Sequence, residues 1–433
     1  MTPGSPEDVP HGEPGASQAA PESSAVARDG ELEGAIRAAA PKALALLVRR
    51  YGVFDQCEDA VQEALLGALT QWRANGVPEQ PVGWLISVAT RRLMDGWRRD
   101  NARRQREVTD FLRTPAQPDE DGVENTDDTL RLLVLCCHPS LTPASQIALT
   151  LRSVGGLTTA EVAAALLVGE TTVAQRISRA KRLIKESGAR FELPTGEEYD
   201  ERLRAVLHVL YLIFNEGHTA SAGDQLQRLD LAVEALRITR MLHEAAPRAG
   251  EVTGLLALMI LTHARRDART GPGGTLVPAD RQDRTRWYAD EIAEGTALVE
   301  AALSSGRVGP YQLEAAIAAV HSEADSVEST DWVQIAELYR ILAEVDPGPM
   351  VTLGAAVAVA MTEGPDAGIA IVDGLADDRH LGDHHRRLSV LAHLYELAGR
   401  DAEAREQYTA ALARTRNIAE QNYLRERIAR LSR

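Results

Sequence analysis

Six side chains between residues 170 and 183 have the chemistry needed to read base edges in duplex DNA. They are Thr171, Thr172, Gln175, Arg176, Arg179 and Arg182. Arg and Gln can each pair with a purine through two hydrogen bonds in the major groove. The apolar residues between them are Val173, Ile177, Ala180 and Ile184. Their spacing of four, three and four predicts a helix that carries the polar residues on its outer face.

A second, shorter helix must hold this reading helix against the DNA. Thr158 and Glu161 form a Thr-x-x-Glu capping box, and a turn at about 167–169 follows, with Leu167 where Gly is common. Such a pair is typical of a helix-turn-helix, whose second helix enters the major groove. Lys181 and Lys185 lie later and suit phosphate contacts. A generic amphipathic helical hairpin is the alternative interpretation.

A second cation-rich stretch, residues 81–104, interleaves Trp with Arg. Its polar and aromatic side chains of interest are Trp84, Arg91, Arg92, Asp95, Trp97, Arg98 and Arg99. Aromatic rings can stack on unpaired bases while Arg holds the phosphates, so the pattern predicts contact with single-stranded DNA. The two Trp residues are equally compatible with a helical core, which is the commoner environment for Trp.

A third set of side chains is acidic and precedes this stretch. Glu58, Asp59, Gln62 and Glu63 have spacings that place them side by side on one helix face. Taken alone, such a face is a solvated acidic surface.

Periodicity and composition predict an all-α chain with five segments. We expect a disordered tail over 1–30, a helical domain over 31–112, an acidic linker over 113–128, a helix-turn-helix domain over 129–190, and a helical extension over 192–433. The extension carries residues at the packing positions of a tetratricopeptide repeat: Leu391, Ala392, Tyr395, Ala404, Tyr408 and Ala411. A weaker copy consists of Gly354, Ala355, Ala358, Ala367, Ile371 and Gly374.

Charge and composition exclude several classes of protein. The net charge of −16, of which residues 191–433 carry −13, argues against a protein that coats nucleic acid unaided. No apolar run is long enough for a membrane span, and three Cys provide no disulfide framework. We therefore expect a cytoplasmic protein. Cys136 and Cys137 are expected in the core, and no catalytic, metal or cofactor motif is present, so we expect no enzyme, metal or cofactor.

The order of these parts resembles the extracytoplasmic-function (ECF) sigma factors of bacterial RNA polymerase. The resemblance implies that Glu58, Asp59, Gln62 and Glu63 bind core polymerase at the β′ clamp, with the β flap as a further contact. It implies that the loop Val77–Pro81 captures an extruded base. It assigns the −10 promoter element to Trp84, Arg91, Arg92, Asp95, Arg98 and Arg99, and the −35 element to Thr171, Thr172, Gln175, Arg176, Arg179 and Arg182. Gly96 is unusual inside the −10 helix.

The long C-terminal half resembles the sigma-factor group with a tetratricopeptide-like extension. The resemblance implies that the extension controls sigma activity and that its repeats bind a protein or peptide partner. Its negative charge leads us to expect that it covers the basic −35 reader. We further expect the acidic linker, Asp119–Asp128, to mimic the charge of nascent RNA. The alternative function is a free-standing helix-turn-helix regulator whose repeat domain senses a ligand or peptide.

Overall fold

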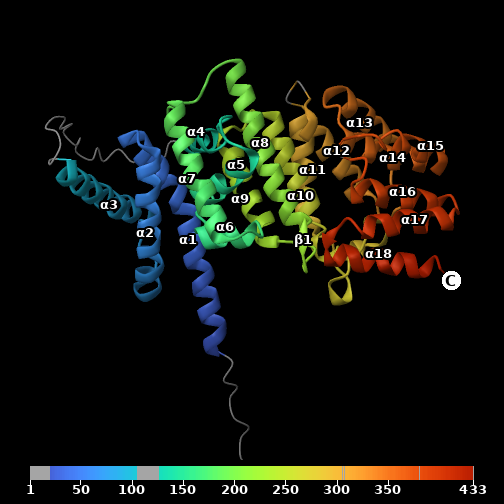
Figure 1. Ribbon diagram of the computed structural model, residues 1–433, viewed down its shortest axis with the longest axis horizontal. Coiled ribbons are helices and arrows are strands. Elements are labelled where there is room, and N and C mark those ends of the chain that lie inside the picture. Colours follow the sequence, from blue (N-terminus) through green and yellow to red (C-terminus); the bar gives the residue numbers. More distant parts are fainter. Residues whose placement is uncertain (1–19, 105–125, 305, 307, 380, 433) are drawn as a thin grey trace, which may run out of the picture.

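The structure is a computed structural model that describes residues 20–104, 126–304, 306, 308–379 and 381–432 (Figure 1). These residues are almost entirely helical, which confirms the predicted fold class. Their only strands are β1 (Ala222–Gly223) and β2 (Arg416–Asn417), which pair in parallel. None of the described helices is long and apolar enough to cross a membrane.

The first three helices pack on one another as an N-terminal bundle. They are α1 (Ala20–Tyr51), α2 (Phe54–Asn75) and α3 (Pro81–Arg104). Gly76, with φ of 85°, follows the last residue of α2, and Pro81 fits the first turn of α3 because it needs no hydrogen-bond acceptor there. The prediction of a tail over 1–30 is wrong for residues 20–30, which begin α1; residues 1–19 lie outside the described part.

The helix-turn-helix domain follows. It comprises α4 (Thr126–Cys136), α5 (Pro143–Ser153), α6 (Thr159–Ala165) and α7 (Glu170–Ser187). The capping box of α6 is confirmed, because Thr158 and Glu161 each accept a hydrogen bond from the other's backbone N–H. The four predicted apolar residues of α7 are all buried. Cys136 and Cys137 are buried too, as expected, and burial raises the pKa of both thiols.

The acidic linker lies mostly outside the described residues, which resume at 126. Its last residue, Asp128, is buried within α4 and pairs with Arg49 of α1 (3.0 Å) and with Arg131 (2.8 Å). The predicted role of the linker as an RNA mimic therefore does not extend to Asp128, whose charge is neutralised inside the protein.

Eleven α-helices form the C-terminal extension within the described residues. They are α8 (Glu197–His218), α9 (Leu229–Ala245), α10 (Gly250–His263), α11 (Ala289–Leu303), α12 (Pro310–Glu323), α13 (Trp332–Val345), α14 (Pro349–Glu363), α15 (Pro365–Asp373), α16 (His385–Leu397), α17 (Asp401–Leu412) and α18 (Ile418–Arg430). Four short 3₁₀ turns connect α10 to α11: η1 (Arg266–Ala268), η2 (Pro272–Gly274), η3 (Ala279–Arg281) and η4 (Arg284–Arg286).

The end of the extension returns to its beginning. In Figure 1, β1 lies beside the start of α18, although about 200 residues separate them in the chain. Asn417 is buried and its Nδ2 donates to the carbonyl oxygens of Ala220 (2.9 Å) and Gln225 (3.0 Å). A buried amide satisfied by two backbone acceptors fixes this closure, because losing either acceptor would leave a desolvated donor.

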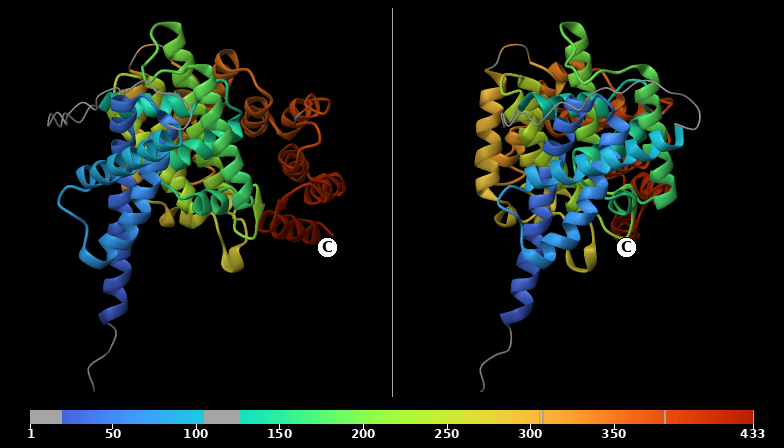
Figure 2. Two further views of the ribbon diagram at one scale, coloured as in Figure 1. Left: turned by 60° about the vertical axis from the view of Figure 1, so that its left-hand side comes forward. Right: turned by 90° about the vertical axis from the view of Figure 1, so that its left-hand side faces the viewer.

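The helix-turn-helix domain and the start of the extension share one hydrophobic core. Helices α4 and α5 contact α8, and α4 also contacts α9, while α1 packs against α4. Figure 2 shows the N-terminal bundle and the extension on opposite sides of this centre. The helix-turn-helix domain is therefore held from both sides.

Residues of the stronger predicted repeat pack together where α16 meets α17, while the tetratricopeptide assignment itself stays a prediction. Ala392, Ala404, Tyr408 and Ala411 are buried where α16 meets α17, with Tyr395 packed against them. The weaker copy does not match the observed burial: of its six residues only Ala358 is buried, and the other buried residues of α14 and α15 are Leu353, Ala356, Ala360, Gly368, Ile369 and Val372. Helix α14 is rich in Ala and Val on every side, so its sequence offers no contrast from which to infer a face.

The close crossing of α10 and α12 at Gly254 predicts that one added methyl group lowers the stability of the protein. A Cβ added at Gly254 would lie 2.7 Å from the backbone N of Gln312, which cannot move as a flexible side chain would. We expect Gly254→Ala to lower the free energy of unfolding by about 1–3 kcal/mol. Gly96→Ala is the matched control, because no atom lies within 4 Å of its added Cβ, and we expect a gain of about 0.5–1 kcal/mol. Urea unfolding measures both; equal effects would contradict the close approach.

Glu314 predicts a pH-dependent contribution to stability. Burial raises the pKa of Glu314 to about 7, although a hydrogen bond from Tyr211 (3.3 Å) opposes the shift. A raised carboxyl pKa adds stability that is complete below about pH 4.5 and lost as the pH rises to about 7. We expect wild type to lose up to about 3 kcal/mol relative to Glu314→Gln between pH 4.5 and 8 in urea titrations. A pH-independent difference between the two proteins would contradict this.

Candidate functional site

The acidic face of α2 is not fully solvated. The carboxylate of Glu58 is completely buried between the helix-turn-helix domain and the bundle, 2.8 Å from Arg152 Nε and 2.8 Å from Lys181 Nζ. Arg152 belongs to α5 and also donates to Thr159 Oγ1 (2.5 Å), so its guanidinium is fixed on both sides. A buried carboxylate needs such paired donors, because an unpaired charge inside the protein costs several kcal/mol.

The residues around Glu58 extend the same contact. Asp59 accepts a hydrogen bond from Lys181 Nζ (2.5 Å), and Asp55 accepts one from Lys185 Nζ (3.1 Å). Gln62 Nε2 donates to the carbonyl oxygen of Arg152 (3.4 Å). Three of the four side chains expected at the polymerase contact therefore face the helix-turn-helix domain. The fourth, Glu63, lies beyond the contact and is half-exposed.

Lys181 was expected to contact DNA phosphates, and in this arrangement it does not. It is buried and its ammonium group is held between Glu58 and Asp59. Burial alone would lower the pKa of Lys181, but the charges of Glu58 and Asp59 outweigh it and raise the pKa. In the sequence, Lys181 directly follows the apolar residue Ala180, so it lies at the edge of the buried face of α7. This position is the one indication in the sequence that Lys181 could be buried.

The two Trp residues of α3 are held by the bundle itself. The ring of Trp97 meets Tyr51 edge to face (5.6 Å between centroids), and its Nε1 donates to Gln56 Oε1. The ring of Trp84 meets Trp72 at 5.4 Å in a similar geometry. Edge-to-face contacts of this kind stabilise a core, so the core interpretation holds for Trp97, which the bundle engages through both its ring and its N–H.

Trp84 differs because it also borders a hollow on the surface of α3. The hollow is lined by Gln71, Gly83, Trp84, Ser87, Val88, Arg91, Arg92 and Asp95. It thus brings together four of the six side chains expected to read the −10 element. Arg98 and Arg99 lie outside it; both are exposed, and both donate to Asp95, through its carboxylate and its backbone carbonyl respectively (3.3 Å each).

The outer face of α7 is open to solvent. Thr171, Thr172, Gln175, Arg179 and Arg182 are exposed, and Arg176 is half-exposed. The stripe that faces α2 contains Ala174, Ser178, Lys181 and Lys185, and Arg182 of the assigned set also lines this contact. The preceding turn places Leu167 at φ of 51°, in the left-handed region that favours glycine. The presence of Leu where Gly is common therefore strains the turn, and the helix-turn-helix geometry is kept.

The extension was expected to cover the basic reading helix, and it contacts other parts of the domain. Arg228 Nη1 donates to the carbonyl oxygens of Ala164 (2.8 Å) and Ala165 (3.3 Å), which end α6. Arg237 Nη2 donates to the carbonyl oxygen of Val154, after α5 (3.1 Å). Within the described residues, α7 instead has its interdomain contact with α2.

The described residues offer no obvious place for a metal ion, since no three His, Cys, Asp or Glu side chains gather at a suitable spacing. The arrangement presents a solvent-exposed cationic helix, an Arg-lined hollow, and a carboxylate face that is engaged within the molecule.

Comparisons with known proteins agree with this layout. Residues 35–104 match the family model "Sigma-70 region 2", and residues 131–184 match "Sigma-70, region 4". Residues 202–303 match a family of unknown function, DUF6596. No solved structure matches the chain.

The chain is similar over almost its whole length to an uncharacterized protein of Rhizobium meliloti (strain 1021). The two are 37% identical over 417 residues, which is 93% of this chain and 96% of that protein. The bundle α1–α3 thus coincides with region 2 and the helix-turn-helix domain with region 4. The chain belongs to the same family as this rhizobial protein, and its regions 2 and 4 make it a sigma-70 family sigma factor with a helical C-terminal extension.

Proposed function

We propose that the chain is an alternative sigma factor of the ECF type. It binds core RNA polymerase, reads −10 and −35 promoter elements and starts transcription, and the polymerase performs the chemistry. The observation that carries this proposal is that one chain holds both an exposed cationic α7 and an Arg-lined hollow on α3. A free-standing regulator that reads duplex DNA through α7 has no use for the second site.

Region 4 is proposed to read the −35 element through α7. The six assigned side chains are Thr171, Thr172, Gln175, Arg176, Arg179 and Arg182. Their exposure fits direct contact with base edges at the N-terminal half of the helix and phosphates further along.

Region 2 is proposed to hold the opened −10 element. The hollow beside Trp84 has the size and chemistry for a nucleotide, with Arg91 and Arg92 for the phosphates and one indole edge for a base. Arg98, Arg99 and Asp95 continue the surface along α3. The loop Val77–Pro81, which connects α2 to α3, is proposed to capture an extruded base.

The acidic face of α2 is proposed to bind the β′ clamp of core polymerase, and region 4 the β flap. Because Glu58 is buried against Arg152 and Lys181, the free protein is in a closed form whose polymerase face is occupied. Core polymerase must therefore displace region 4 from region 2 before it can bind Glu58 and Asp59. The closed form keeps Glu58 of the free sigma factor from core polymerase until region 4 is displaced.

The extension is proposed to be a tetratricopeptide-like regulatory domain of this cytoplasmic protein. It supports region 4 through the shared core of α4, α5, α8 and α9 and through Arg228 and Arg237. A protein or peptide partner of the repeats would act on region 4 through these contacts. Control thus depends on how the extension holds region 4, not on covering its basic face.

Arg152→Gln tests the closed form directly. The substitution removes one partner of Glu58 and leaves every residue assigned to polymerase or DNA unchanged. Removing one member of a buried ion pair costs about 3–5 kcal/mol, which shifts the equilibrium toward the open form. We expect the apparent Kd for core polymerase to fall at least tenfold, measured by fluorescence anisotropy of labelled full-length chain. Arg405→Gln, which removes an exposed guanidinium on α17, is the matched control. Equal affinities of wild type and Arg152→Gln would contradict the closed form.

Arg179→Ala tests promoter reading. We expect it to reduce initiation at least tenfold in a run-off assay with core polymerase, because a guanidinium on a base edge contributes about 1–3 kcal/mol. Arg190→Ala, which removes an exposed cation just beyond α7, is the control and should initiate normally. If the wild-type chain initiated no better than core polymerase alone, the sigma proposal would fail. Specific duplex binding by the chain alone would instead favour a free-standing regulator.

A further inference from the structure

The extension encloses a cavity that the sigma function does not use. Its volume is about 570 Å³, within the range of small-molecule sites. Its walls come from helices far apart in the chain: α8 and α10, then α12, α13 and α14, and finally α16 and α18. The pairing of β1 with β2 brings these ends of the extension together. The cavity therefore exists only in the folded, closed extension.

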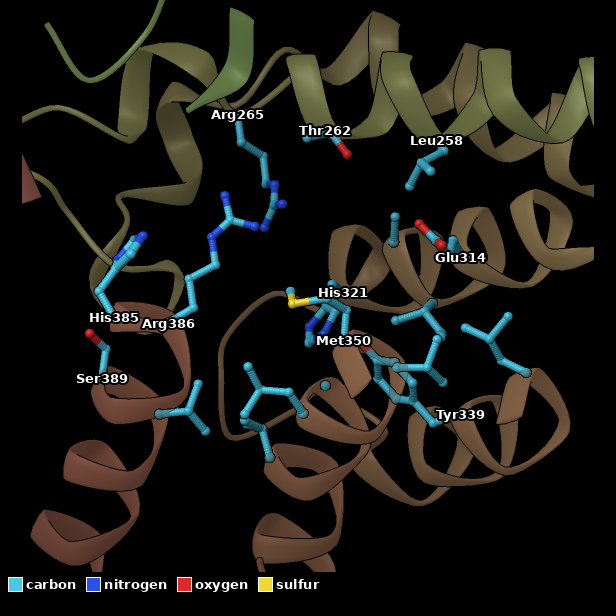
Figure 3. A pocket seen from close by; sticks show the side chains of 18 of the residues that line it. Leu258, Thr262, Arg265, Glu314, His321, Tyr339, Met350, His385, Arg386 and Ser389 are labelled. Carbon is cyan, nitrogen blue, oxygen red and sulfur yellow. The ribbon is translucent and has the colours of Figure 1, made fainter. Parts of the chain in front are cut away.

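Two arginines project into the cavity from opposite walls. Arg265 follows α10 and Arg386 belongs to the first turn of α16. Figure 3 shows their guanidinium groups pointing toward one another in the cavity, with Arg386 exposed at its rim. No carboxylate of the described residues lies within ion-pair distance of either group, and the buried Nε of Arg265 has no acceptor. Burial, followed by the charge of Arg284, lowers the pKa of Arg265 to about 10.

The other ionisable groups of the cavity do not neutralise this pair. Glu420 also lines the cavity, accepts a hydrogen bond from Thr415 Oγ1 (2.5 Å) and lies 3.6 Å from His385, but its one negative charge offsets only one of the two guanidinium groups. Burial raises the pKa of Glu314 to about 7, so its carboxyl is largely protonated below that pH. Burial, with the charges of Arg265 and Arg284, lowers the pKa of His321 to about 4 and keeps this ring neutral. The polar end of the cavity is thus electropositive.

The rest of the lining is apolar and includes Leu258, Ile317, Met350 and Val390. Two guanidinium groups that converge on one point match the planar oxygens of a carboxylate or a similar anion. A buried guanidinium with no carboxylate at ion-pair distance destabilises the folded protein, and an anion bound by Arg265 and Arg386 would remove that cost. We propose that the cavity is a binding site for a small organic anion, with Arg265 and Arg386 holding the anionic group and the apolar wall holding its hydrocarbon part.

The proposal is independent of the sigma function and is tested by binding alone. Isothermal calorimetry with the full-length chain uses octanoate as the probe and 1-octanol as the neutral molecule of equal chain length. We expect saturable binding of one octanoate, with 1-octanol at least tenfold weaker. Arg265→Gln and Arg386→Gln should each weaken octanoate binding at least tenfold, while Arg386→Lys retains most of it. Arg405→Gln, on the outer surface of α17, should bind as wild type does.

A stability measurement separates lost binding from lost folding. Without probe, Arg265→Gln should have a Tm equal to or above that of wild type, since it removes a buried guanidinium whose Nε has no acceptor, and Arg386→Gln, at an exposed side chain, should have the Tm of wild type. Absence of saturable octanoate binding, equal binding of 1-octanol, or unchanged affinity in both Gln variants would each overturn the proposal.

Discussion

The arrangement of this protein depends on one buried carboxylate, Glu58, and its two cationic partners. Arg152 and Lys181 come from different helices of region 4, so this one side chain of region 2 pairs with two region 4 helices at once, beside the contacts of Asp55, Asp59 and Gln62 and the packing of α1 on α4. A buried ion triad adds little net stability compared with an apolar contact, but losing one partner is costly. Such a contact forms only in one geometry, and it is lost when a competing partner binds one of the three charged groups. It suits a reversible closure better than a permanent one.

If α2 binds core polymerase as proposed, the contact between regions 2 and 4 competes with polymerase binding. The same carboxylates that hold region 4 are the ones assigned to core polymerase, so the two contacts exclude each other. Docking on the polymerase would release region 4 from region 2. The two regions could then move far enough apart to reach both promoter elements. Most side chains assigned to the −35 element are exposed in the closed form, because α7 contacts α2 mainly through a neighbouring stripe, with Arg182 at its edge. What the closed form withholds is the polymerase face.

Features that depend on neighbouring residues were predictable from the sequence, and those that depend on distant ones were not. The capping box at Thr158 and the buried face of α7 follow from spacings of three and four residues. The burial of Glu58 depends on Arg152 and Lys181, which lie 94 and 123 residues away in the chain. No residue near Glu58 in the sequence indicates these partners. Arg265 and Arg386 could not be paired from the sequence for the same reason. They line one cavity only because the closure at Asn417 brings the two ends of the extension together.

The distance between regions 2 and 4 in solution is the most direct measure of the central claim. Spin labels at Ala74→Cys, on the exposed end of α2, and Ser187→Cys, on the exposed end of α7, avoid the three buried native thiols. Pulsed dipolar spectroscopy of the free chain should give one narrow distance distribution, which moves to longer distances when core polymerase is added. A broad distribution in the free chain, or one that core polymerase leaves unchanged, would contradict the account.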